Sequence, residues 1–328
     1  MSVTTSGIPT TSLTSVPSAS LTDSLTNAIS SVISSNISSV VSSALSNTNS
    51  IASAAATAIS TMKSVTNANK HALLIGCNYT SIPNITLKGC INDVINIEHM
   101  LIDAYGYYQE NIVVLRDDSA NPALKPTNAN IMTQIQNLVA KSGSYSQIWI
   151  HYSGHGIQLP DMEQDSISDN GTNTKLEGCI VPLDYQSAGV ITRDVLYDHI
   201  KNIKCPAIMM WDACHSGTLC DLEWSFICQS ASAYSRIQTN NVSNGNLDIY
   251  SISGCRDSQV SYDSYNVESQ IPMGAFTCAV IACLRQAHHN IPIMLLYRNI
   301  CAYLANAGIN QLPILSSFNP APSLVICQ

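Results

Sequence analysis

From residue 70 onward, apolar runs of strand length alternate with longer segments of helical periodicity, and this alternation limits the possible folds most. Residues 72–75, 112–115 and 147–152 are short apolar runs. Between them, residues 89–104 and 127–140 place apolar side chains at helical spacing. Strands that alternate with helices pair mostly in parallel, and helices cover both faces of the sheet. We therefore expect an α/β fold, a three-layer α/β/α sandwich with a mostly parallel central sheet.

The same alternation continues to the end of the chain. Two more strands are expected at residues 206–211 and 247–253, and two more helices near residues 274–287 and 293–304. Polar segments at residues 161–176 and 229–246 are predicted to be long loops.

The first 62 residues have a different composition, with 29 Ser or Thr side chains and Asp23 as the only charged one. Residues 1–66 therefore form a low-complexity tail before a folded domain at residues 67–328. Two interpretations of this tail stay open. Low charge and high serine content favour disorder, whereas the four-residue repeat at residues 30–45 favours a helix that forms when it docks on a membrane or on other copies.

Composition excludes several functions. Only 11% of residues are charged, the net charge is −8, and no Lys/Arg cluster is present, which argues against a nucleic-acid partner. The 12 cysteines include no CxxC pair, so neither a disulfide framework nor a zinc site is expected. No signal peptide or apolar run of membrane-spanning length is found. We expect a protein without a transmembrane segment that is intracellular and cytoplasmic.

Two of the predicted strands end in residue types that carry chemistry. Residues 147–152 lead into His155, and residues 206–211 lead into Cys214. A lone histidine or cysteine is ordinary, but the two at neighbouring strand ends indicate a thiolate nucleophile with an imidazole base. We expect a catalytic dyad without a third side chain. The N–H groups of Gly156 and Cys214 are the predicted oxyanion hole.

The segments around these residues resemble the catalytic motifs of metacaspases, which belong to the caspase-like clan of cysteine peptidases. The motifs are His-Tyr-Ser-Gly-His-Gly at residues 151–156 and Asp-Ala-Cys-His-Ser-Gly at residues 212–217. The histidine precedes the cysteine by 59 residues, close to the separation of about 50 typical of the clan. Further similar segments are residues 72–79, 87–94, 126–131 and 253–257. The resemblance extends from residue 70 to about residue 315 and implies a caspase-like fold and a type I metacaspase.

The resemblance also implies that this peptidase cleaves polypeptides after Arg or Lys. Asp93 and Asp212 are suited to bind guanidinium or ammonium groups, and by motif match Cys90 and Ser153 join them. Each acidic residue has a structural alternative. Asp93 can serve as a carboxylate at a helix start, and Asp212 as a cap at the end of a strand.

Calcium activation is implied by the family, but the sequence departs from the family's pattern here. The expected ligand positions fall on Glu177, Asp194, Asp221 and Arg193. Three are carboxylates that suit calcium, while the arginine can pair with them and occupy the site without metal. Calcium dependence and calcium independence both remain open.

The family also implies a zymogen that cleaves itself. The chain would then divide into a large-subunit-like part (67–228), a linker loop (229–246) and a small-subunit-like part (247–328). Arg236 is the self-cleavage candidate in that loop, although it is equally well explained as a solvated arginine, and Lys63 and Lys70 can mark removal of the tail. By resemblance we expect a monomer.

Two other functions are considered. A catalytically silent caspase-like scaffold would act through its tail, but such proteins usually lack one member of the dyad. Another caspase-clan peptidase, such as a paracaspase, would be expected to carry recognisable interaction domains before the peptidase unit.

Overall fold

The computed structural model describes residues 69–160, 176–214, 219–220, 222–230, 233–239, 248–255, 263–265 and 271–327. The chain divides into two units, Met1–Lys63 and Ser64–Gln328, and every described residue belongs to the second unit. The predictions for the low-complexity tail and for Lys63 therefore lie outside the described residues.

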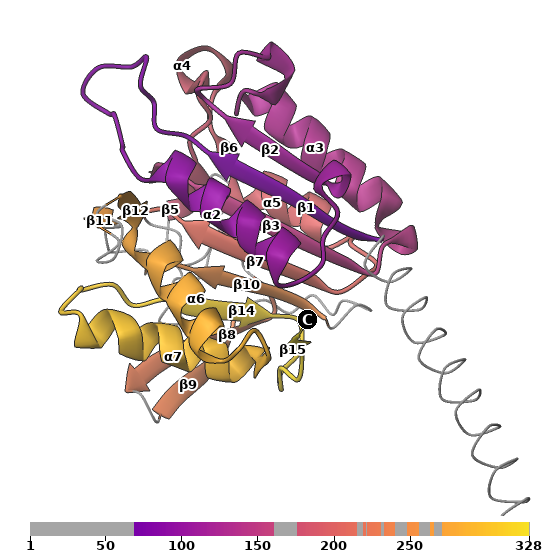
Figure 1. Cartoon of the computed structure of the whole chain (residues 1–328), viewed down its shortest axis with the longest axis vertical. Helices are drawn as coiled ribbons and strands as arrows, with labels where there is room; N and C mark the ends of the chain where they lie inside the picture. The colour runs from indigo at the N-terminus through magenta and orange to yellow at the C-terminus, as the bar shows by residue number, and fades with distance from the viewer. Residues whose placement is uncertain are drawn as a thin grey trace, which may run out of the picture. The chain divides into compact units, whose positions relative to one another are not determined.

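An eight-stranded sheet forms the centre of the second unit (Figure 1). Its strands in spatial order are β2 (Ile112–Arg116), β1 (Lys70–Gly76), β3 (Gln147–Ser153), β7 (Ala207–Asp212), β10 (Ile249–Ser253), β14 (Ile314–Ser317), β8 (Trp224–Ser230) and β9 (Ala233–Gln238). The first five strands are mutually parallel, and β14, β8 and β9 pair antiparallel at the other side. The predicted mostly parallel sheet is confirmed.

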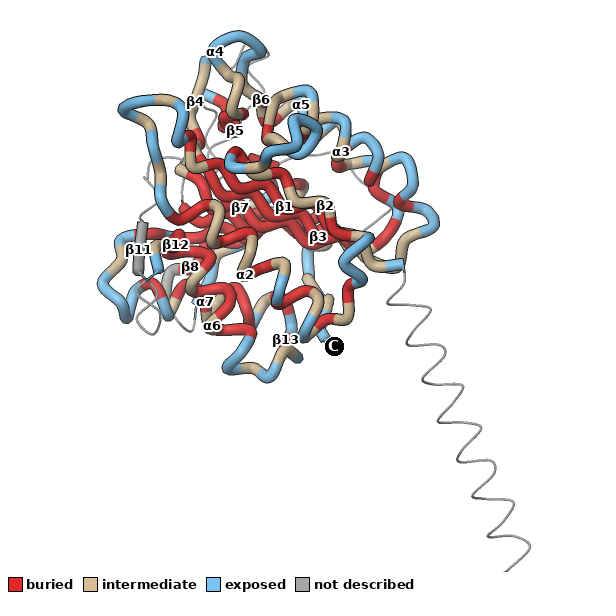
Figure 2. The backbone as a smooth tube through the Cα atoms, turned by 45° about the horizontal axis from the view of Figure 1, so that its top comes forward, coloured by how far each residue is buried: buried red, intermediate tan, exposed pale blue. Residues whose placement is uncertain are grey.

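Helices cover both faces of this sheet, as Figure 2 shows. One face carries α2 (Cys90–Asp103), α6 (Ala275–Gln286) and α7 (Ile293–Asn306), and the other carries α3 (Asn128–Lys141) and α5 (Arg193–Ile200). The start of α3 follows the sequence expectation, because the Thr127 hydroxyl accepts a hydrogen bond from the Asn130 amide at 3.3 Å. The three-layer α/β/α sandwich is thus confirmed.

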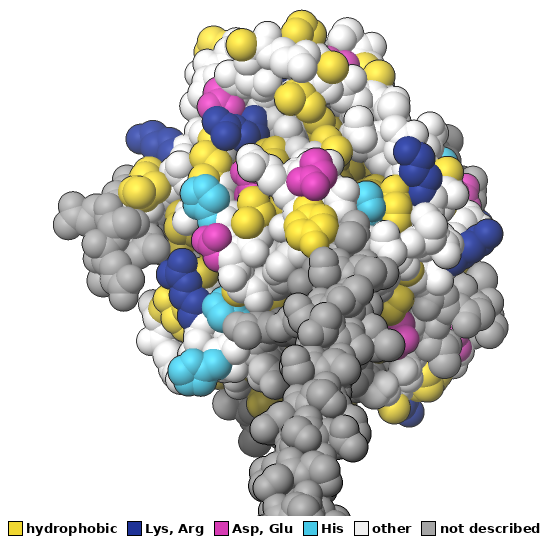
Figure 3. All heavy atoms as spheres, turned by 45° about the vertical axis from the view of Figure 1, so that its right-hand side comes forward, with side chains coloured by type: hydrophobic (Ala, Val, Ile, Leu, Met, Phe, Trp, Pro, Cys, Tyr) yellow, Lys and Arg dark blue, Asp and Glu magenta, His cyan; other side chains and the backbone are white. Residues whose placement is uncertain are grey.

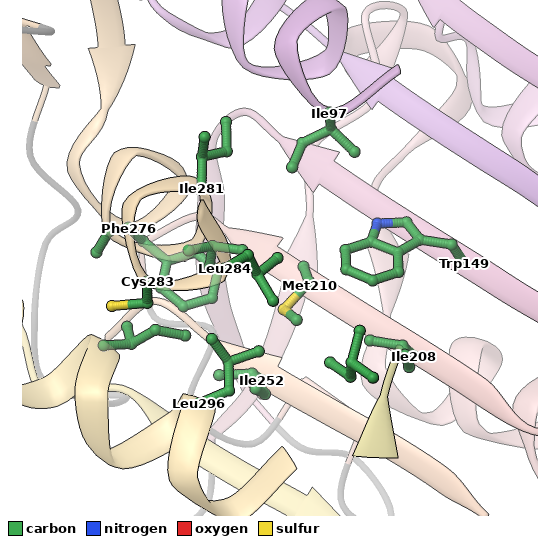
Figure 4. Packing of buried hydrophobic residues seen from close by; sticks show 14 of the residues in the cluster. Ile97, Trp149, Ile208, Met210, Ile252, Phe276, Ile281, Cys283, Leu284 and Leu296 are labelled. Carbon is green, nitrogen blue, oxygen red and sulfur yellow. The ribbon is translucent and has the colours of Figure 1, made fainter. Parts of the chain in front are cut away.

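Alternation along each strand divides the core into two halves. Trp149, Ile208 and Met210 face α2, α6 and α7, where they meet Phe276 and Leu284 among other apolar side chains (Figure 4). The intervening strand residues face α3 and α5. Both halves exclude water almost completely, and each fully buried aliphatic side chain contributes about 1.5–3 kcal/mol to stability. This packing fixes the register of the central strands.

Smaller elements surround the sheet. Beyond the carboxyl end of β3, the strands β4 (Gly156–Pro160), β5 (Leu176–Ile180) and β6 (Ile191–Thr192) form a second sheet. The remaining elements are β11 (Asp263–Tyr265), β12 (Pro272–Gly274), β13 (Ile291–Pro292), β15 (Val325–Ile326), the short helix α4 (Tyr185–Ala188) and the 3-10 turns Gln109–Asn111, Pro122–Leu124 and Ser142–Ser144.

The prediction of a loop over residues 229–246 is wrong for residues 233–238, which form the edge strand β9. β9 lacks the usual alternation of buried apolar side chains, because all of its residues are exposed or half-buried. Arg236 is therefore a strand residue. Its guanidinium lies over the Trp224 ring at 4.6 Å and donates to the Pro320 carbonyl at 2.6 Å.

Lys70 is also part of the folded domain. It belongs to β1, and its ammonium donates to the Tyr105 carbonyl at 2.8 Å. Cleavage after Lys70 would require this strand to leave the sheet, so the structure disfavours Lys70 as a processing site.

Three further properties of the described residues concern membrane spanning, the cysteines and the surface charge. No helix in the described ranges is long and apolar enough to cross a bilayer. All 12 cysteines lie within those ranges and are free thiols. On the face drawn in Figure 3, Lys and Arg side chains are scattered singly among other residue types.

Candidate active site

The predicted dyad lies where β3 and β7 end side by side. Parallel pairing places Ser153 opposite Asp212, and the Gly154 amide extends the ladder to the Asp212 carbonyl at 3.2 Å. His155 lies two residues after the end of β3, and Cys214 lies two residues after the end of β7. Both residues are therefore at the same edge of the sheet. Gly156 packs directly on the main chain of Cys214, because a Cβ at position 156 would collide with the Cys214 carbonyl. The structure thus brings both members of the predicted dyad and both predicted oxyanion-hole residues together.

The imidazole of His155 is oriented by a main-chain carbonyl. Its Nε2 lies 2.7 Å from the oxygen of Ile85, in the segment between β1 and α2. A carbonyl accepts and cannot donate, so Nε2 carries the hydrogen and Nδ1 is the nitrogen that remains to accept a proton. The expectation of a dyad without a third side chain agrees with this arrangement, and the orienting group was missed because it is a main-chain atom.

A buried aspartate, Asp117, and the half-buried Asn78 hold the segment that carries Ile85. The Asp117 carboxylate, directly after β2, accepts hydrogen bonds from the amides of Asn78 (3.0 Å) and Thr80 (3.2 Å). The Asn78 side-chain oxygen accepts from the Cys90 amide at 3.0 Å at the start of α2. Hydrogen bonds from main-chain amides to a charged carboxylate are among the stronger ones. The segment between β1 and α2 is therefore fixed to the residue after β2 and to the start of α2.

Two tyrosine hydroxyls clamp the main chain of His155. The Tyr79 hydroxyl accepts from the His155 amide at 3.1 Å and donates to the Val181 carbonyl at 2.6 Å. The Tyr152 hydroxyl donates to the His155 carbonyl at 2.7 Å. Burial raises the pKa of both phenols, so they remain protonated donors. Tyr79 also has a φ of 53°, an uncommon conformation for a non-glycine residue, and its ring centroid lies 4.8 Å from that of the His155 ring, with the two planes tilted by 38°.

The two predicted pocket carboxylates, Asp93 and Asp212, form an acidic pair beneath the dyad. Asp93 lies on the first turn of α2, is fully buried, and accepts from the Ser153 hydroxyl at 2.6 Å. Its two oxygens also accept from the Gly274 amide at 2.9 and 3.1 Å. A Cβ on Gly274 would meet both carboxylates, so no side chain fits there. Residues far apart in the sequence thereby converge on one charged cluster.

Asp212 is bound by the start of α6. Its Oδ2 accepts from the Thr277 amide at 2.9 Å and from the Thr277 hydroxyl at 2.8 Å. The amides of a first helical turn have no partner within the helix and attract negative charge. The structural alternative for Asp212, a cap, therefore describes part of its role, although the capped element is α6 rather than its own strand.

Two further cysteines, Cys90 and Cys278, lie on the helices that carry the partners of the acidic pair. Cys90 is buried at the start of α2. Cys278 follows Thr277 on α6, and burial together with the charges of Asp93 and Asp212 raises the pKa of its thiol to about 12. A thiol with so high a pKa is a poor nucleophile at neutral pH.

His151 is a buried histidine on the same face of β3 as Ser153. Burial lowers its pKa from 6.5 to about 3, so the ring stays neutral in the folded protein. Below pH 6.5 the unfolded chain binds a proton on this ring and the folded chain does not, so acid favours unfolding. We expect this residue to reduce the free energy of unfolding by about 1.4 kcal/mol per pH unit as pH falls from about 6 towards 4.

Urea unfolding of wild type and His151→Gln between pH 7 and pH 4.5 checks this expectation. The variant should lose stability less steeply with falling pH, whereas the exposed-site control His99→Gln should follow wild type. Parallel curves for wild type and His151→Gln would contradict the assignment.

The calcium positions are only partly described, since Asp221 lies outside the described residues. Glu177 on β5 and Arg193 at the start of α5 are buried, with Asp194 next to Arg193. The Arg193 guanidinium donates to the Asp194 carboxylate at 2.9 Å from Nε and 2.6 Å from Nη2. β5 pairs with β6 through Cys179 and Thr192, so Glu177 lies two residues before this pair and Arg193 directly after it. A buried guanidinium that already neutralises a carboxylate there does not fit a divalent cation, and the described residues contain no group of three or more metal-ligating side chains.

A three-layer sandwich with a histidine and a cysteine at adjacent strand ends defines a caspase-like class of protein, and comparisons with known proteins give the family. Residues 70–223 match the model for the metacaspase peptidase C14 domain. Metacaspase-1 from Cryptococcus neoformans is 31% identical over 312 residues, covering 80% of this chain and 66% of the relative. Metacaspase-1B from Aspergillus oryzae is 38% identical over 169 residues, covering 51% and 39%. The chain belongs to the metacaspase family.

The chain spans less than two thirds of the length of the relatives just named. Among solved structures, the protein GSU0716 from Geobacter sulfurreducens matches with a TM-score of 0.50 and 17% identity, over 77% of this chain and 94% of the other. This last likeness concerns the fold alone.

Proposed function

We propose that this chain is a cysteine endopeptidase that cleaves polypeptides after Arg or Lys and needs no calcium. The observation that carries the proposal is the pairing of Ser153 with Asp212. That one register brings His155 beside Cys214 and sets the acidic pair, Asp93 and Asp212, next to them. A nucleophile and its base thus lie beside fixed negative charge that suits a basic side chain.

The chemistry follows from the atoms in place. His155 Nδ1 takes the thiol proton of Cys214, and the thiolate attacks the carbonyl carbon of the scissile bond. The N–H groups of Gly156 and Cys214 donate hydrogen bonds to the carbonyl oxygen and stabilise the negative charge that develops on it. His155 then gives the proton to the leaving amine, and a water activated by the same nitrogen hydrolyses the acyl-enzyme.

Specificity is assigned to the acidic pair, with Ser153 and Cys90 beside it. Asp93 and Asp212 are nearly inaccessible to water, at 0% and 4% exposure. An unpaired negative charge there is costly, and a guanidinium or ammonium group of the substrate offsets that charge. An aspartate side chain would add a third negative charge to the cluster and is disfavoured.

The experiment that tests this function is a comparison of matched fluorogenic peptides that end in Arg, Lys, citrulline or Asp. We expect turnover of the Arg and Lys peptides, and at least about 100-fold lower kcat/KM for the other two, since a lost buried ion pair is worth about 3 kcal/mol or more. Faster cleavage after Asp would reject the pocket. Absence of turnover of every peptide would favour the silent scaffold instead.

Calcium independence gives a separate prediction. Wild type is expected to cleave equally well in calcium and in chelator, because Arg193 supplies the positive charge near Asp194. Arg193→Gln removes that charge and should lower stability by about 1 kcal/mol, because the half-buried Asp194 carboxylate loses this ion pair.

Added calcium should then raise the melting temperature of Arg193→Gln and not that of wild type, and calorimetry should detect calcium binding only to the variant. The surface ion-pair variant Arg116→Gln is the control, since its pair with Asp118 is partly exposed. Activation or stabilisation of wild type by calcium would contradict the assignment.

Self-processing is proposed only outside β9. Because Arg236 is held in an edge strand and by Trp224 and Pro320, cleavage after it would require the β8–β9 hairpin to open.

A further inference from the structure

One residue on α6, Thr277, holds the Asp212 carboxylate through two hydrogen bonds. Its Oδ2 accepts two hydrogen bonds from Thr277, one from the amide and one from the hydroxyl, at 2.9 and 2.8 Å. Thr277 is itself fully buried, so neither bond competes with water. The amide bond follows from the position of α6, whereas the hydroxyl bond depends on which way the hydroxyl hydrogen points.

His151 is a second partner of this hydroxyl. Its Nε2 lies 3.4 Å from the Thr277 hydroxyl oxygen. The hydroxyl has a single hydrogen, which is committed to Asp212, so towards His151 its oxygen can only accept. His151 is therefore the neutral form that carries its hydrogen on Nε2, consistent with its lowered pKa. The hydrogen bonds run in one direction, from His151 through Thr277 to Asp212.

The other ring nitrogen of His151 indicates that packing alone does not explain this residue. Nδ1 is buried and has no hydrogen-bond partner. A buried polar atom without a partner destabilises the fold, a cost that an apolar side chain of the same shape would avoid. A histidine at this position, despite its unpaired Nδ1, is explained if its Nε2–H is required as the donor to Thr277.

Resting on the proposed function, we infer that Thr277 and His151 are positioning residues for substrate specificity, which hold the Asp212 carboxylate in the orientation that binds the guanidinium of a substrate arginine. Paired hydrogen bonds between a guanidinium and a carboxylate require a fixed plane. Without the Thr277 hydroxyl, the carboxylate loses one of its two hydrogen bonds to α6 and is held less firmly in its plane. The lost orientation weakens binding of a charged side chain more than that of a neutral one.

The test measures binding without turnover, in the Cys214→Ala background, by calorimetry with peptides that end in Arg or in its neutral analogue citrulline. Thr277→Val removes the hydroxyl and keeps the shape and the amide. We expect Kd for the Arg peptide to rise about tenfold, since one charge-assisted hydrogen bond is worth about 1.5 kcal/mol. Kd for the citrulline peptide should change less than about threefold. Thr277→Ser should restore the preference, and Thr133→Val on the exposed face of α3 should leave it unchanged.

His151 gives an independent pair of variants if Thr277→Val does not fold. His151→Phe removes the donor, and His151→Gln keeps an N–H near the Nε2 position. We expect a smaller loss of Arg preference in the Phe variant, about threefold because the 3.4 Å contact is long, and recovery in the Gln variant. An unchanged Arg preference in both Thr277→Val and His151→Phe would overturn the inference. A Cys214→Ala protein that binds Arg no better than citrulline would overturn the proposed pocket, and this inference with it.

Discussion

Replacing Cys214 or His155 by alanine is expected to lower kcat/KM for an Arg peptide by roughly 10⁴-fold or more, the order found when a member of a catalytic unit is removed. The thiolate forms the bond to substrate, and His155 both creates that thiolate and protonates the leaving group. Because the two side chains act in one step, kcat/KM of the double variant should be no lower than that of the less active single variant.

Steady-state kinetics of the two single variants and the double variant check this expectation. Cys327→Ala removes an exposed thiol near the end of the chain and should match wild type. Losses that add in the double variant would mean that the two residues act independently. Wild-type turnover by Cys214→Ala would remove it as the nucleophile.

Gly156→Ala is expected to lower kcat by about 100-fold or more, because a displacement of about 1 Å at a reacting centre costs that much. The added Cβ would collide with the Cys214 carbonyl, so either the main chain of Cys214 or that of residue 156 must move. Both the nucleophile and the two proposed oxyanion donors belong to these segments. The variant should also be less stable, since its backbone cannot keep the native contact.

Gly143→Ala is the matched control, because the only nearby atom is the Lys204 Cδ at 3.6 Å. This second variant should keep activity and stability. Kinetics together with urea unfolding separate a shifted site from a lost fold. Normal kcat in Gly156→Ala would contradict the close packing of the dyad.

The strands that frame the site were predictable because each is an uninterrupted apolar run. Burial on both faces selects residues such as those of β3 and β7, and the parallel pairing of neighbouring strands then brings their ends together. His155, Cys214, Asp93 and Asp212 could be found in this way, since each lies at or shortly after the end of a predicted strand or in the first turn of a predicted helix.

Other parts of the site left no comparable signal. Ile85 contributes a main-chain oxygen, which any residue possesses. Thr277 lies on a helix whose apolar pattern predicts burial but not which strand end it meets. The edge strand β9 escaped prediction because its exposed side chains lack the apolar alternation of a core strand. Arg236 was consequently placed in a loop, although it packs on Trp224.

The most direct test of the account uses an electrophilic peptide that ends in an arginyl ketone, followed by mass spectrometry of the labelled protein. All 12 cysteines are free thiols, so the position of the label is informative. The account predicts one adduct, on Cys214, formed in chelator and much faster than with the matching aspartyl ketone. An adduct on another cysteine, or faster labelling by the aspartyl probe, would contradict it.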